Sequence, residues 1–548
     1  MKMTFLRTLS ITYLVFLLFS CSNSTVVAPA AIKTNAQLNI LFIVADDLGF
    51  TDIGAFGGEI STPTLDKLAA AGTRLTNMHA APTCQPTRAM LMASTGYNRA
   101  ITVRPKQPNG ERDNLLKLEW AIIPELLQDA GYATYATGKW DLGRDPGYTA
   151  ATRGFDRSFV QLNGSASHMR EYLMDMEDLS YEDDGKSVAI EDLDEDFFAT
   201  EYYTDKMLEY IASTEQGKPW FAYVPYTAPH WPLQLPDDWL HKYAGKYEQG
   251  YDALRQQRFE SAMAAGVIPR NSSLEQYTSY AEPWDRLSAD EQRKYIRAQE
   301  IFAGMVEFMD MSIGRILDYL ESSGQLENTV IVFTADHGAS QGEFGVSTGR
   351  IKGSGGPKMP NNRDNRLENF GRLGSWIDHG RGYAEASTAP YKFFKGSLHE
   401  GGLLSAGFVY YPAKVKAGAI SSEFMTMMDF LPTFLDIAGS KHPGAGPYRG
   451  RQINDIMGES AWPHLTGQSQ TVHDKSYAAG WSTGGDRGRG ALIQGDFKII
   501  NTNPPGEQGP ATWRLYNLVD DPGEHKNLAA DNPELVQAML AEWEANWR

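Results

Sequence analysis

One apolar run decides the fold of this chain: Leu38-Asn39-Ile40-Leu41-Phe42-Ile43-Val44, which stops at Asp46-Asp47. A run without polar alternation is typical of a central strand that is covered on both faces. Further helices are predicted from Thr62-Pro63 to Gly72, over 122–130 and over 297–320, and further strands over 132–136, 220–224 and 329–333. Strands that alternate with helices predict an α/β fold, with a large mixed sheet sandwiched between helices.

The pattern of the sequence changes after about residue 470. Short strands are predicted over 475–481, 491–500 and 513–518, followed by a helix that begins at Asn532-Pro533. We therefore expect a main domain over residues 37–468 and a smaller C-terminal α+β subdomain over 469–548, with an antiparallel sheet and a terminal helix. Residues 340–390 are rich in Gly, Asn and Arg and are predicted to form a long functional loop.

The composition is that of a globular protein with an acidic balance. A chain of 548 residues with 42% hydrophobic residues is long enough to bury a large core and a smaller one. The formal net charge of −18 argues against a nucleic-acid partner, because phosphate neutralisation needs a basic face. An anionic small substrate is still compatible with this charge if a few cations gather in one pocket.

The N-terminal residues predict export. Basic residues precede an apolar run over 9–19, which is typical of a signal peptide and short for a membrane-spanning helix. Ser20-Cys21 resembles the end of a bacterial lipoprotein signal, so we expect residues 1–21 to be a signal peptide with an acylated Cys21 and residues 22–36 to be a tether. The protein would be a periplasmic, outer-membrane or cell-surface lipoprotein that meets the membrane only through its lipid anchor. The alternative is a plain secretory signal that is discarded together with Cys21.

Carboxylates follow two of the predicted strands. Asp46-Asp47 ends the first strand, and Asp336-His337 follows the strand over 329–333. Functional residues of α/β sheets gather at the carboxyl ends of strands. Adjacent carboxylates repel each other unless a cation lies between them, and hard oxygen ligands suit calcium or magnesium. These residues therefore predict a metal site; the alternatives are a solvated turn for the aspartates and a loop-carbonyl partner for His337.

The chain has two cysteines, and Cys84 has the more informative surroundings. If Cys21 is lipidated or removed, Cys84 is an unpaired thiol in an exported protein. It begins the segment Cys84-Gln85-Pro86-Thr87-Arg88, in which the proline places the cysteine at a helix N-terminus. The free amide groups and the helix dipole there are expected to activate a thiolate. The alternative is a buried cysteine that acts as a small hydrophobic residue.

This segment resembles the signature of the sulfatase family, Cys-x-Pro-x-Arg before an Ala/Ser-rich stretch, whose cysteine is converted to formylglycine. Other motifs occur in the order that the family shows: Asp46-Asp47, Gly138-Lys139-Trp140-x-Leu142-Gly143, Pro229-His230, Asp336-His337-Gly338, Lys395-Gly396, Glu400-Gly401-Gly402, and Leu515-Tyr516-Asn517-Leu518 before Asp521-Pro522-Gly523-Glu524. The resemblance covers residues 38–548 and looks nearest to the bacterial arylsulfatase branch.

The resemblance implies a fold similar to that of alkaline phosphatase and hydrolysis of a sulfate ester. It implies one Ca²⁺ per chain, held by Asp46, Asp47, Asp336, His337 and Cys84, the last converted to 3-oxoalanine (formylglycine). It also implies four residues around the substrate: Arg88 to orient the aldehyde hydrate, and Lys139, His230 and Lys395 to grip the sulfate ester. One hydroxyl of the hydrate would attack sulfur, and the other would lose its proton as sulfate leaves. The implied partners are a sulfated small molecule or glycan and a formylglycine-generating maturation enzyme.

One position departs from the family pattern, because Asp141 stands where the family usually has histidine in Gly-Lys-Trp-His-Leu-Gly. We predict that Asp141 accepts the proton of the hydrate, and that nearby positive charge keeps the pKa of its carboxyl low. The alternative is that Asp141 neutralises Lys139 or caps the loop, while water or His230 takes the proton.

Two other functions fit the same sequence. The scaffold also carries phosphate and phosphonate monoester hydrolases, which the motifs alone do not separate from sulfatases. A non-catalytic surface protein that binds sulfated glycans is the second alternative. The choice between aryl, alkyl and carbohydrate sulfates depends on loops at the pocket rim, to which His168 and residues 350–381 are expected to contribute.

Overall fold

The computed structural model describes residues 37–102, 115–172, 181–274, 279–343, 345–346, 363–472, 476–480, 489–502 and 512–547. The predicted signal peptide, Cys21 and the tether lie outside these residues, and so does part of the expected rim loop, residues 350–362. Within the described residues, no helix combines the length and the apolar character that crossing a membrane requires.

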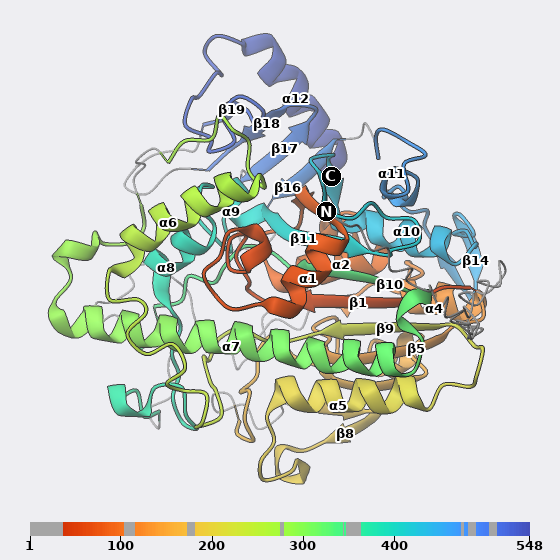
Figure 1. Ribbon diagram of the computed structural model, residues 1–548. Helices are drawn as coiled ribbons and strands as arrows, with labels where there is room; N and C mark the ends of the chain where they lie inside the picture. The colour runs from red at the N-terminus through yellow and green to blue at the C-terminus, as the bar shows by residue number, and fades with distance from the viewer. Residues whose placement is uncertain are drawn as a thin grey trace, which may run out of the picture. The chain divides into compact units, whose positions relative to one another are not determined.

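Eleven strands form the main sheet, and β1 lies near its middle (Figure 1). The order across the sheet is β12 (Ala419–Ser421), β2 (Thr73–His79), β11 (Leu404–Tyr410), β10 (Thr329–Ala335), β1 (Asn39–Ala45), β9 (Trp220–Pro225), β5 (Ala133–Lys139), β6 (Arg157–Gln161), β7 (Tyr181–Asp183) and β8 (Lys186–Val188), with β13 (Met425–Thr426) also paired to β2. Strands β10, β1, β9, β5 and β6 run parallel, whereas β11 and β7 join them antiparallel. The predicted fold class, a mixed sheet between helices, is confirmed.

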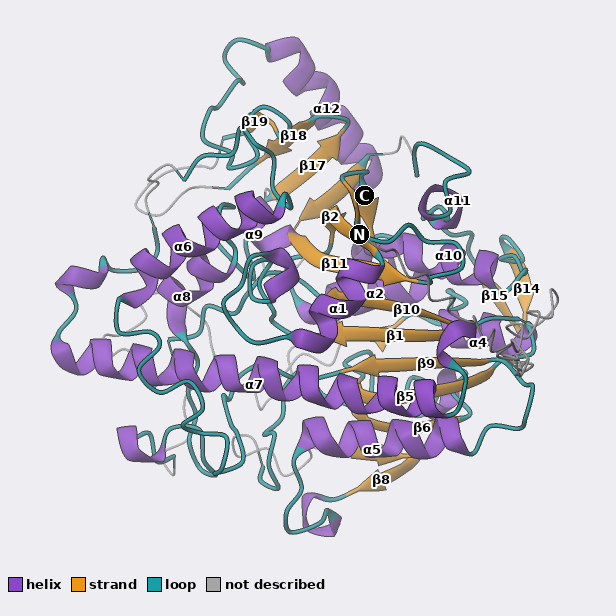
Figure 2. Cartoon of the chain, viewed as in Figure 1, coloured by secondary structure: helices purple, strands orange, loops and turns teal. Residues whose placement is uncertain are grey.

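Alternate residues of β1 enter two different hydrophobic cores. Leu41 and Ile43 pack into a core shared with α1 (Pro63–Ala71), α5 (Ala199–Ala212), α6 (Gly250–Ala265) and α7 (Ala289–Ser322). Ile40 and Phe42 pack into a core shared with α2 (Cys84–Ala93), α4 (Ile123–Asp129) and α10 (Phe430–Ile437). Figure 2 shows α5 and α7 in front of the strands. Burial on both faces explains why this strand is apolar throughout.

Helix α7 begins earlier than the sequence pattern predicted. It starts at Ala289 rather than at residue 297, because Ser288 and Glu291 form a capping box. The Glu291 backbone N–H donates to Ser288 Oγ at 3.3 Å, and the Ser288 N–H donates to Glu291 Oε2 at 3.0 Å. This reciprocal pair satisfies two backbone donors that a helix start leaves open. The Ser-x-x-Glu spacing is visible in the sequence and marks the correct start.

The C-terminal part contains a four-stranded antiparallel sheet, of β16 (Tyr477–Gly480), β17 (Gly490–Gln494), β18 (Phe497–Ile500) and β19 (Arg514–Asn517). The single strand predicted over 491–500 is wrong, since Gln494 pairs with Phe497 across the two-residue turn Gly495-Asp496. Gly495 has a φ of +57°, a conformation that suits glycine in such a turn. Helix α12 (Pro533–Trp547) packs Met539 and Trp543 onto one face of this sheet.

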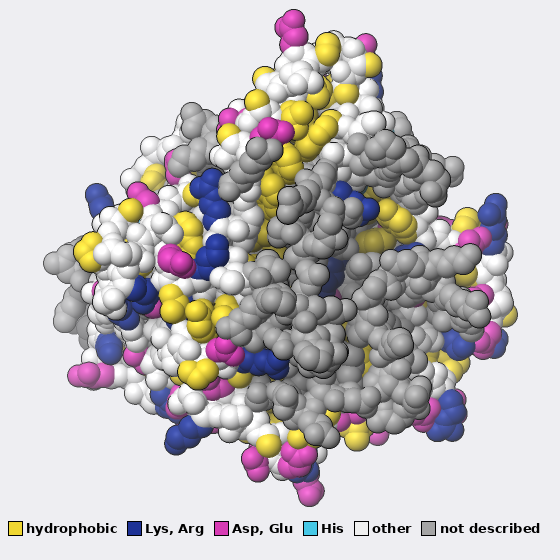
Figure 3. Space-filling model, turned by 180° about the vertical axis from the view of Figure 1, so that it is seen from behind, with side chains coloured by type: hydrophobic (Ala, Val, Ile, Leu, Met, Phe, Trp, Pro, Cys, Tyr) yellow, Lys and Arg dark blue, Asp and Glu magenta, His cyan; other side chains and the backbone are white. Residues whose placement is uncertain are grey.

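Figure 3 shows the molecule from the side opposite to that of Figure 1. Hydrophobic side chains form a band towards the top of that view, where Figure 1 places the C-terminal elements. Acidic and basic side chains are interspersed around the edge of the same face.

The long loop predicted over 340–390 is not entirely irregular. It contains the 3₁₀ helix η6 (Leu367–Asn369) and the helix α8 (Gly380–Ser387), which packs against α6. The remaining described elements are α3 (Tyr97–Ala100), α9 (Glu400–Leu403), α11 (Trp462–Leu465), β3 (Ile101–Thr102), β4 (Leu115–Leu116), β14 (Gly446–Tyr448), β15 (Arg451–Ile453), η1 (Gly54–Phe56), η2 (Ala151–Arg153), η3 (Ile190–Asp192), η4 (Trp284–Arg286), η5 (Leu326–Asn328) and η7 (Met427–Asp429).

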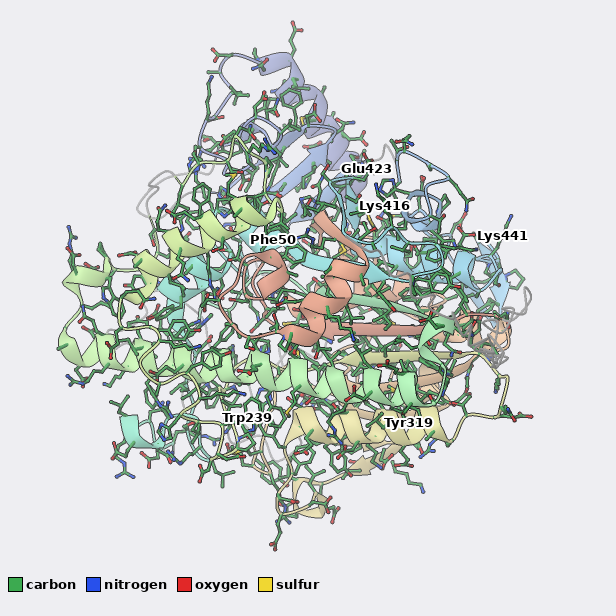
Figure 4. The ribbon with its side chains drawn as sticks, viewed as in Figure 1. Phe50, Trp239, Tyr319, Lys416, Glu423 and Lys441 are labelled. Atoms are coloured by element: carbon green, nitrogen blue, oxygen red, sulfur yellow. The ribbon has the colours of Figure 1, made fainter. Side chains whose placement is uncertain are left out.

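The segment after β1 is anchored by an aromatic cluster around Phe50, which Figure 4 labels. The Phe50 ring meets Phe56 edge to face at 5.1 Å between centroids and meets Tyr391 at 5.2 Å. Edge-to-face packing of buried rings is a favourable and directional contact. It fixes the chain immediately after Asp46-Asp47, where the predicted site begins.

Candidate active site

The two acidic motifs meet at the carboxyl ends of neighbouring parallel strands. Ala45 of β1 lies opposite Ala335 of β10, so Asp46 and Asp336 leave the sheet at the same level. The Asp336 N–H donates to Ala45 O at 3.0 Å, and the Asp47 N–H donates to Asp336 Oδ1 at 3.2 Å. Asp47 adopts a φ of 65°, a left-handed conformation that aspartate tolerates better than most residues. The sheet register therefore brings together residues that are 289 positions apart.

These residues form a candidate metal site. Two overlapping sets place their ligand atoms within 4.8 Å of one another: Asp46, Cys84, Asp336 and His337, and Asp46, Asp47, Cys84 and His230. Within the described part of the chain, Asp46 Oδ1 and Asp47 Oδ2 are buried and accept no hydrogen bond. Buried carboxylate oxygens are costly without a partner, and oxygen-rich sets suit hard cations. His337 Nδ1 lies 2.8 Å from Gly338 O, which directs the Nε2 lone pair towards the same point. The donor set therefore fits a hard divalent cation.

Cys84 is the first residue of α2 and lies between this cluster and a lysine. Its Sγ is 3.1 Å from His337 Nε2 and 3.3 Å from Lys395 Nζ. Burial raises the pKa of the Cys84 thiol well above its usual value, and the carboxylates of Asp46 and Asp336 raise it further. The expected activation of a thiolate is therefore wrong, because burial and neighbouring negative charge outweigh the helix N-terminus. The position suits a side chain that does not need to ionise as a thiolate.

Each carboxylate of the cluster has a cationic neighbour. The closest pairs are Lys139 Nζ with Asp46 Oδ2 at 2.6 Å, Lys395 Nζ with Asp47 Oδ1 at 2.6 Å, and Arg88 Nη2 with Asp336 Oδ2 at 3.2 Å. Burial is the largest single effect on the pKa of Lys139 and lowers it, but Asp46 together with its other acidic neighbours holds this pKa above the usual value. Burial likewise lowers the pKa of Lys395, but Asp47 and Asp46 act with other neighbouring groups to raise it well above the usual value. Both lysines therefore stay charged, and an anion at this point would meet fixed positive groups.

His230 follows β9 and faces the acidic cluster. Its Nε2 is 3.4 Å from Asp47 Oδ2, and its Nδ1 is 2.5 Å from Trp231 O. Because a carbonyl only accepts, Nδ1 carries the hydrogen and Nε2 presents its lone pair to the site. Burial lowers the pKa of His230 to about 3. The ring is therefore neutral at pH 7, with the lone pair of Nε2 facing the site.

His168 lies behind His230 rather than at the pocket rim. It is fully buried, and its Nε2 is 2.8 Å from the His230 carbonyl oxygen, to which it donates. The His168 backbone N–H donates to Gln234 Oε1 at 2.9 Å. Burial lowers the pKa of His168 to about 4, so it acts as a neutral donor. The expectation that His168 shapes the rim is wrong, because the loop that carries it packs inward.

The turn that carries Lys395 is held by a buried ionic network from the C-terminal part. Lys498 Nζ lies 2.7 Å from Glu400 Oε1 and 2.9 Å from Glu524 Oε1. The Glu400 N–H donates to Glu524 Oε2 at 2.9 Å, and Lys392 Nζ donates to Glu524 O at 2.6 Å. Motifs that are distant in the sequence therefore meet on this turn. Lys498 was not singled out in the sequence, where it is an ordinary strand lysine.

Asp141 stands slightly apart from the cluster. It follows β5 at a φ of 55° and is only partly buried. A Cβ atom added at Gly164 would lie 3.1 Å from Asp141 Oδ1, so glycine there leaves room for the carboxylate. Burial raises the pKa of Asp141 to about 6, more than Lys139 and Arg88 lower it. The expectation of a low pKa is therefore wrong, because desolvation of the carboxylate is the larger effect.

One acidic residue near the site was missed by sequence reasoning. Asp378 is buried and accepts hydrogen bonds from Ser340 Oγ at 2.6 Å and from the Gly342 N–H at 2.9 Å. Burial raises the pKa of Asp378 to about 7, and Asp47 adds to this rise, whereas Lys395 opposes it. The residue lies in the Gly-rich loop, where no periodic pattern or strand end singles it out.

Comparison with known proteins places this geometry in context. The chain matches the family described as Sulfatase over residues 38–440. It is 36% identical over 528 residues to an uncharacterized sulfatase of Schizosaccharomyces pombe, with 92% of each chain covered. It is 32% identical over 419 residues to the arylsulfatase of Klebsiella aerogenes, covering 73% of this chain and 86% of that protein. The crystal structure of Ps i-CgsB in complex with k-i-k-neocarrahexaose is similar, with a TM-score of 0.65 at 23% identity and coverage of 93% and 92%.

Proposed function

This chain belongs to the sulfatase family and is a sulfuric ester hydrolase, and from that premise we propose how its residues perform the reaction. The proposed nucleophile is a formylglycine made from Cys84, and the proposed metal is one calcium ion held by Asp46, Asp47, Asp336 and His337. The observation that carries the proposal is the position of Cys84 Sγ, in contact with both His337 Nε2 and Lys395 Nζ. The modified side chain would thus lie between the metal ligands and a cation that can bind sulfate.

The formylglycine hydrate and the calcium ion would supply two kinds of chemistry. A hydrated aldehyde at position 84 would supply a hydroxyl nucleophile that needs no thiolate, and calcium would supply Lewis acidity and positive charge. The chain itself holds the substrate. Lys139 and Lys395 stay charged through Asp46 and Asp47, and their ammonium groups stabilise the negative charge on the sulfuryl oxygens.

Proton movement falls to His230 and Asp141 in this proposal. Neutral His230 accepts a proton at Nε2, and it has to take up that proton before it can give one to the leaving alcohol. Asp141, whose pKa is about 6, is ionised at neutral pH and lies close enough to Lys139 to interact with its charge. A carboxylate with a pKa near the working pH is a suitable general base. We therefore assign proton acceptance to Asp141 in place of the usual histidine.

The first test compares matched esters of 4-nitrophenol. At neutral pH a sulfate monoester carries one negative charge and a phosphate monoester carries close to two. Three buried carboxylates surround the site, and like charges placed together cost several kcal/mol. We therefore expect kcat/KM to be about 100-fold higher for the sulfate than for the phosphate. The phenyl phosphonate ester carries one negative charge, as the sulfate does, and its assay separates a preference for charge from a preference for sulfur.

Two results would contradict this assignment. Faster hydrolysis of the phosphate or phosphonate would make the protein a phosphoester or phosphonate hydrolase. Failure to hydrolyse any of the three esters, in protein whose Cys84 is verified as formylglycine, would favour a protein that only binds sulfated glycans.

The second test replaces Asp141 by Asn, which keeps the shape and removes the base. We expect kcat to fall about 100-fold with little change in KM, because general-base catalysis contributes at least this much. In the unchanged protein the rate should fall as the pH drops below about 6, where Asp141 takes up a proton, and the variant should lose this limb. Asp141→His should move this limb to lower pH, since burial and the nearby charges of Lys139 and Arg88 disfavour a protonated imidazole, as burial does at His168 and His230.

Two further variants control for this test. Gly164→Ala should crowd the carboxylate and lower kcat in part, without removing any charge. Asp290→Asn removes the same charge from an exposed side chain on α7 and should leave kcat and the pH profile unchanged. Near-normal turnover of Asp141→Asn with an unchanged pH profile, in protein that carries formylglycine, would show that Asp141 only neutralises Lys139.

A further inference from the structure

A cavity of about 350 Å³ opens beside Lys395. Its lining includes the turn of Lys395 and Gly396, Arg381 from α8, and the aromatic residues Tyr280 and Phe394. Its volume is within the range of ligand-binding cavities, about 300–1,000 Å³. Because Lys395 Nζ also contacts Cys84 Sγ, the cavity adjoins the proposed sulfate site.

The charged side chains that line the cavity are basic, although the protein as a whole is acidic. Arg381, Arg489 and Lys395 line it, and no Asp or Glu among the described residues does so. The whole chain has a formal net charge of −18, so a lining whose charged residues are all basic is not expected from the average composition of the protein. Cationic clefts concentrate anionic ligands by focusing the local field. The lining therefore favours an anionic ligand.

The two arginines come from distant parts of the chain and meet at Tyr280. The Arg381 Cζ atom lies 5.8 Å from the centre of the Tyr280 ring, and Arg381 Nη1 donates to Tyr280 O at 3.4 Å. Both Arg381 and Arg489 lower the pKa of Tyr280, although burial raises it overall, so both charges lie near the phenol. The Arg381 Nε–H is buried and makes no hydrogen bond within the described residues. This Nε atom lies 3.9 Å from Glu343 Oε1, so contacts with an anionic ligand would come from the terminal amino groups of Arg381.

The aromatic side of the cavity, formed by Tyr280, Phe393 and Phe394, is held in place by neighbouring contacts. Buried Glu385 accepts from Ser279 Oγ at 2.7 Å and from the Tyr280 N–H at 3.4 Å. The Tyr280 ring packs against Phe393 at 5.1 Å and against Phe394 at 5.9 Å between centroids. Tyr280 nevertheless remains 41% exposed. An exposed ring on a fixed support can contact the apolar face of a sugar or an arene.

We propose that this cavity, through Arg381 and Arg489, binds a second anionic group of the substrate, a carboxylate or a second sulfate, while Tyr280 contacts the ring that bears it. The inference rests on the proposed function and specifies its substrate class, namely sulfate esters that carry a further negative charge. Guanidinium groups bind carboxylate and sulfate oxygens through paired N–H donors, which a lysine cannot reproduce. Singly charged aryl sulfates are hydrolysed without help from this cavity.

Three saccharide probes test the proposal. N-acetylglucosamine 6-sulfate has one anionic group, glucosamine 2-N,6-O-disulfate adds a second sulfate, and a uronic acid linked to N-acetylglucosamine 6-sulfate adds a carboxylate. We expect kcat/KM to be about 10-fold higher or more for at least one doubly anionic probe than for the first. The preferred probe identifies which anion the cavity binds. Raising the salt concentration should reduce this preference, because Arg489 is exposed and its charge is screened.

Arg381→Gln and Arg489→Gln should each lower kcat/KM for the preferred probe by about 10-fold, mostly through KM, and leave 4-nitrophenyl sulfate unchanged. Arg381→Lys should restore only part of the loss. Arg293→Gln, which removes the same charge from the exposed surface of α7, is the matched control and should have no effect. Melting temperatures of all variants, measured in parallel, identify any loss that comes from unfolding.

Two outcomes overturn the proposal while leaving the proposed function intact. The first is normal hydrolysis of 4-nitrophenyl sulfate with no preference for either doubly anionic probe. The second is an equal loss on singly and doubly anionic esters in folded Arg381→Gln protein. If the unchanged protein hydrolyses no sulfate ester at all, the proposed function fails instead.

Discussion

Replacing Cys84 by Ala should abolish turnover of sulfate esters, with a loss of about four orders of magnitude or more in kcat. Removal of a covalent nucleophile leaves only binding and electrostatic stabilisation by groups such as Lys139 and Lys395. Stability should change little, since the substitution removes one buried sulfur atom and leaves the carboxylate partners of both lysines in place. Kinetic assay and thermal melting of the same preparations measure both effects.

Mass spectrometry of the peptide over residues 81–88 gives the decisive control for this result. Active protein should carry an aldehyde or its hydrate at position 84 in place of the thiol. Cys84→Ser, which keeps a small polar side chain, should be as inactive as Cys84→Ala wherever the serine is found unmodified. Full turnover by protein that carries only the thiol would disprove the formylglycine mechanism.

Exhaustive chelation should also abolish activity, and it should lower the melting temperature by several degrees. Binding of an ion to the folded state alone stabilises it by about 4 kcal/mol when the ion is present at 1,000 times its Kd. The effect on stability is moderate because Arg88, Lys139 and Lys395 already face the three carboxylates. The effect on activity is larger. The three cations and the three carboxylates nearly cancel in charge, so the ion supplies the excess positive charge that an anionic substrate needs.

Added metals and one variant extend this test. Calcium should restore activity and melting temperature, and magnesium should do so less well, because it requires smaller and more regular octahedral geometry. Asp47→Asn should need more calcium for half-maximal activity, whereas Asp290→Asn on the surface should not. Undiminished activity after chelation, with no metal detected by elemental analysis, would rule out a metal-dependent reaction.

Local patterns in the sequence were sufficient for most of the fold. The apolar run over 38–44 predicted a strand covered on both faces, and β1 has alternate residues in two cores. Helix α1 and strand β9 lie close to where turn residues and apolar spacing placed them. The errors came from local signals that were overlooked, such as the capping box at Ser288 and the turn at Gly495-Asp496. The family resemblance, now confirmed by the comparisons, also followed from short motifs in fixed order.

The sequence by itself therefore determined the family, the fold class and which residues are candidates for the site, because those features are written in neighbouring residues and their order. The ionisation of these candidates, and the groups they contact, depend on the folded arrangement. The raised pKa values of Cys84 and Asp141 and the lowered pKa of His230 are set mainly by burial, to which the whole fold contributes. The meeting of Arg381 with Arg489 beside Lys395 likewise depends on elements that are distant in the chain and adjacent only after folding. Desolvation and charge pairing depend on distances in space, and no local pattern in the sequence specifies those distances.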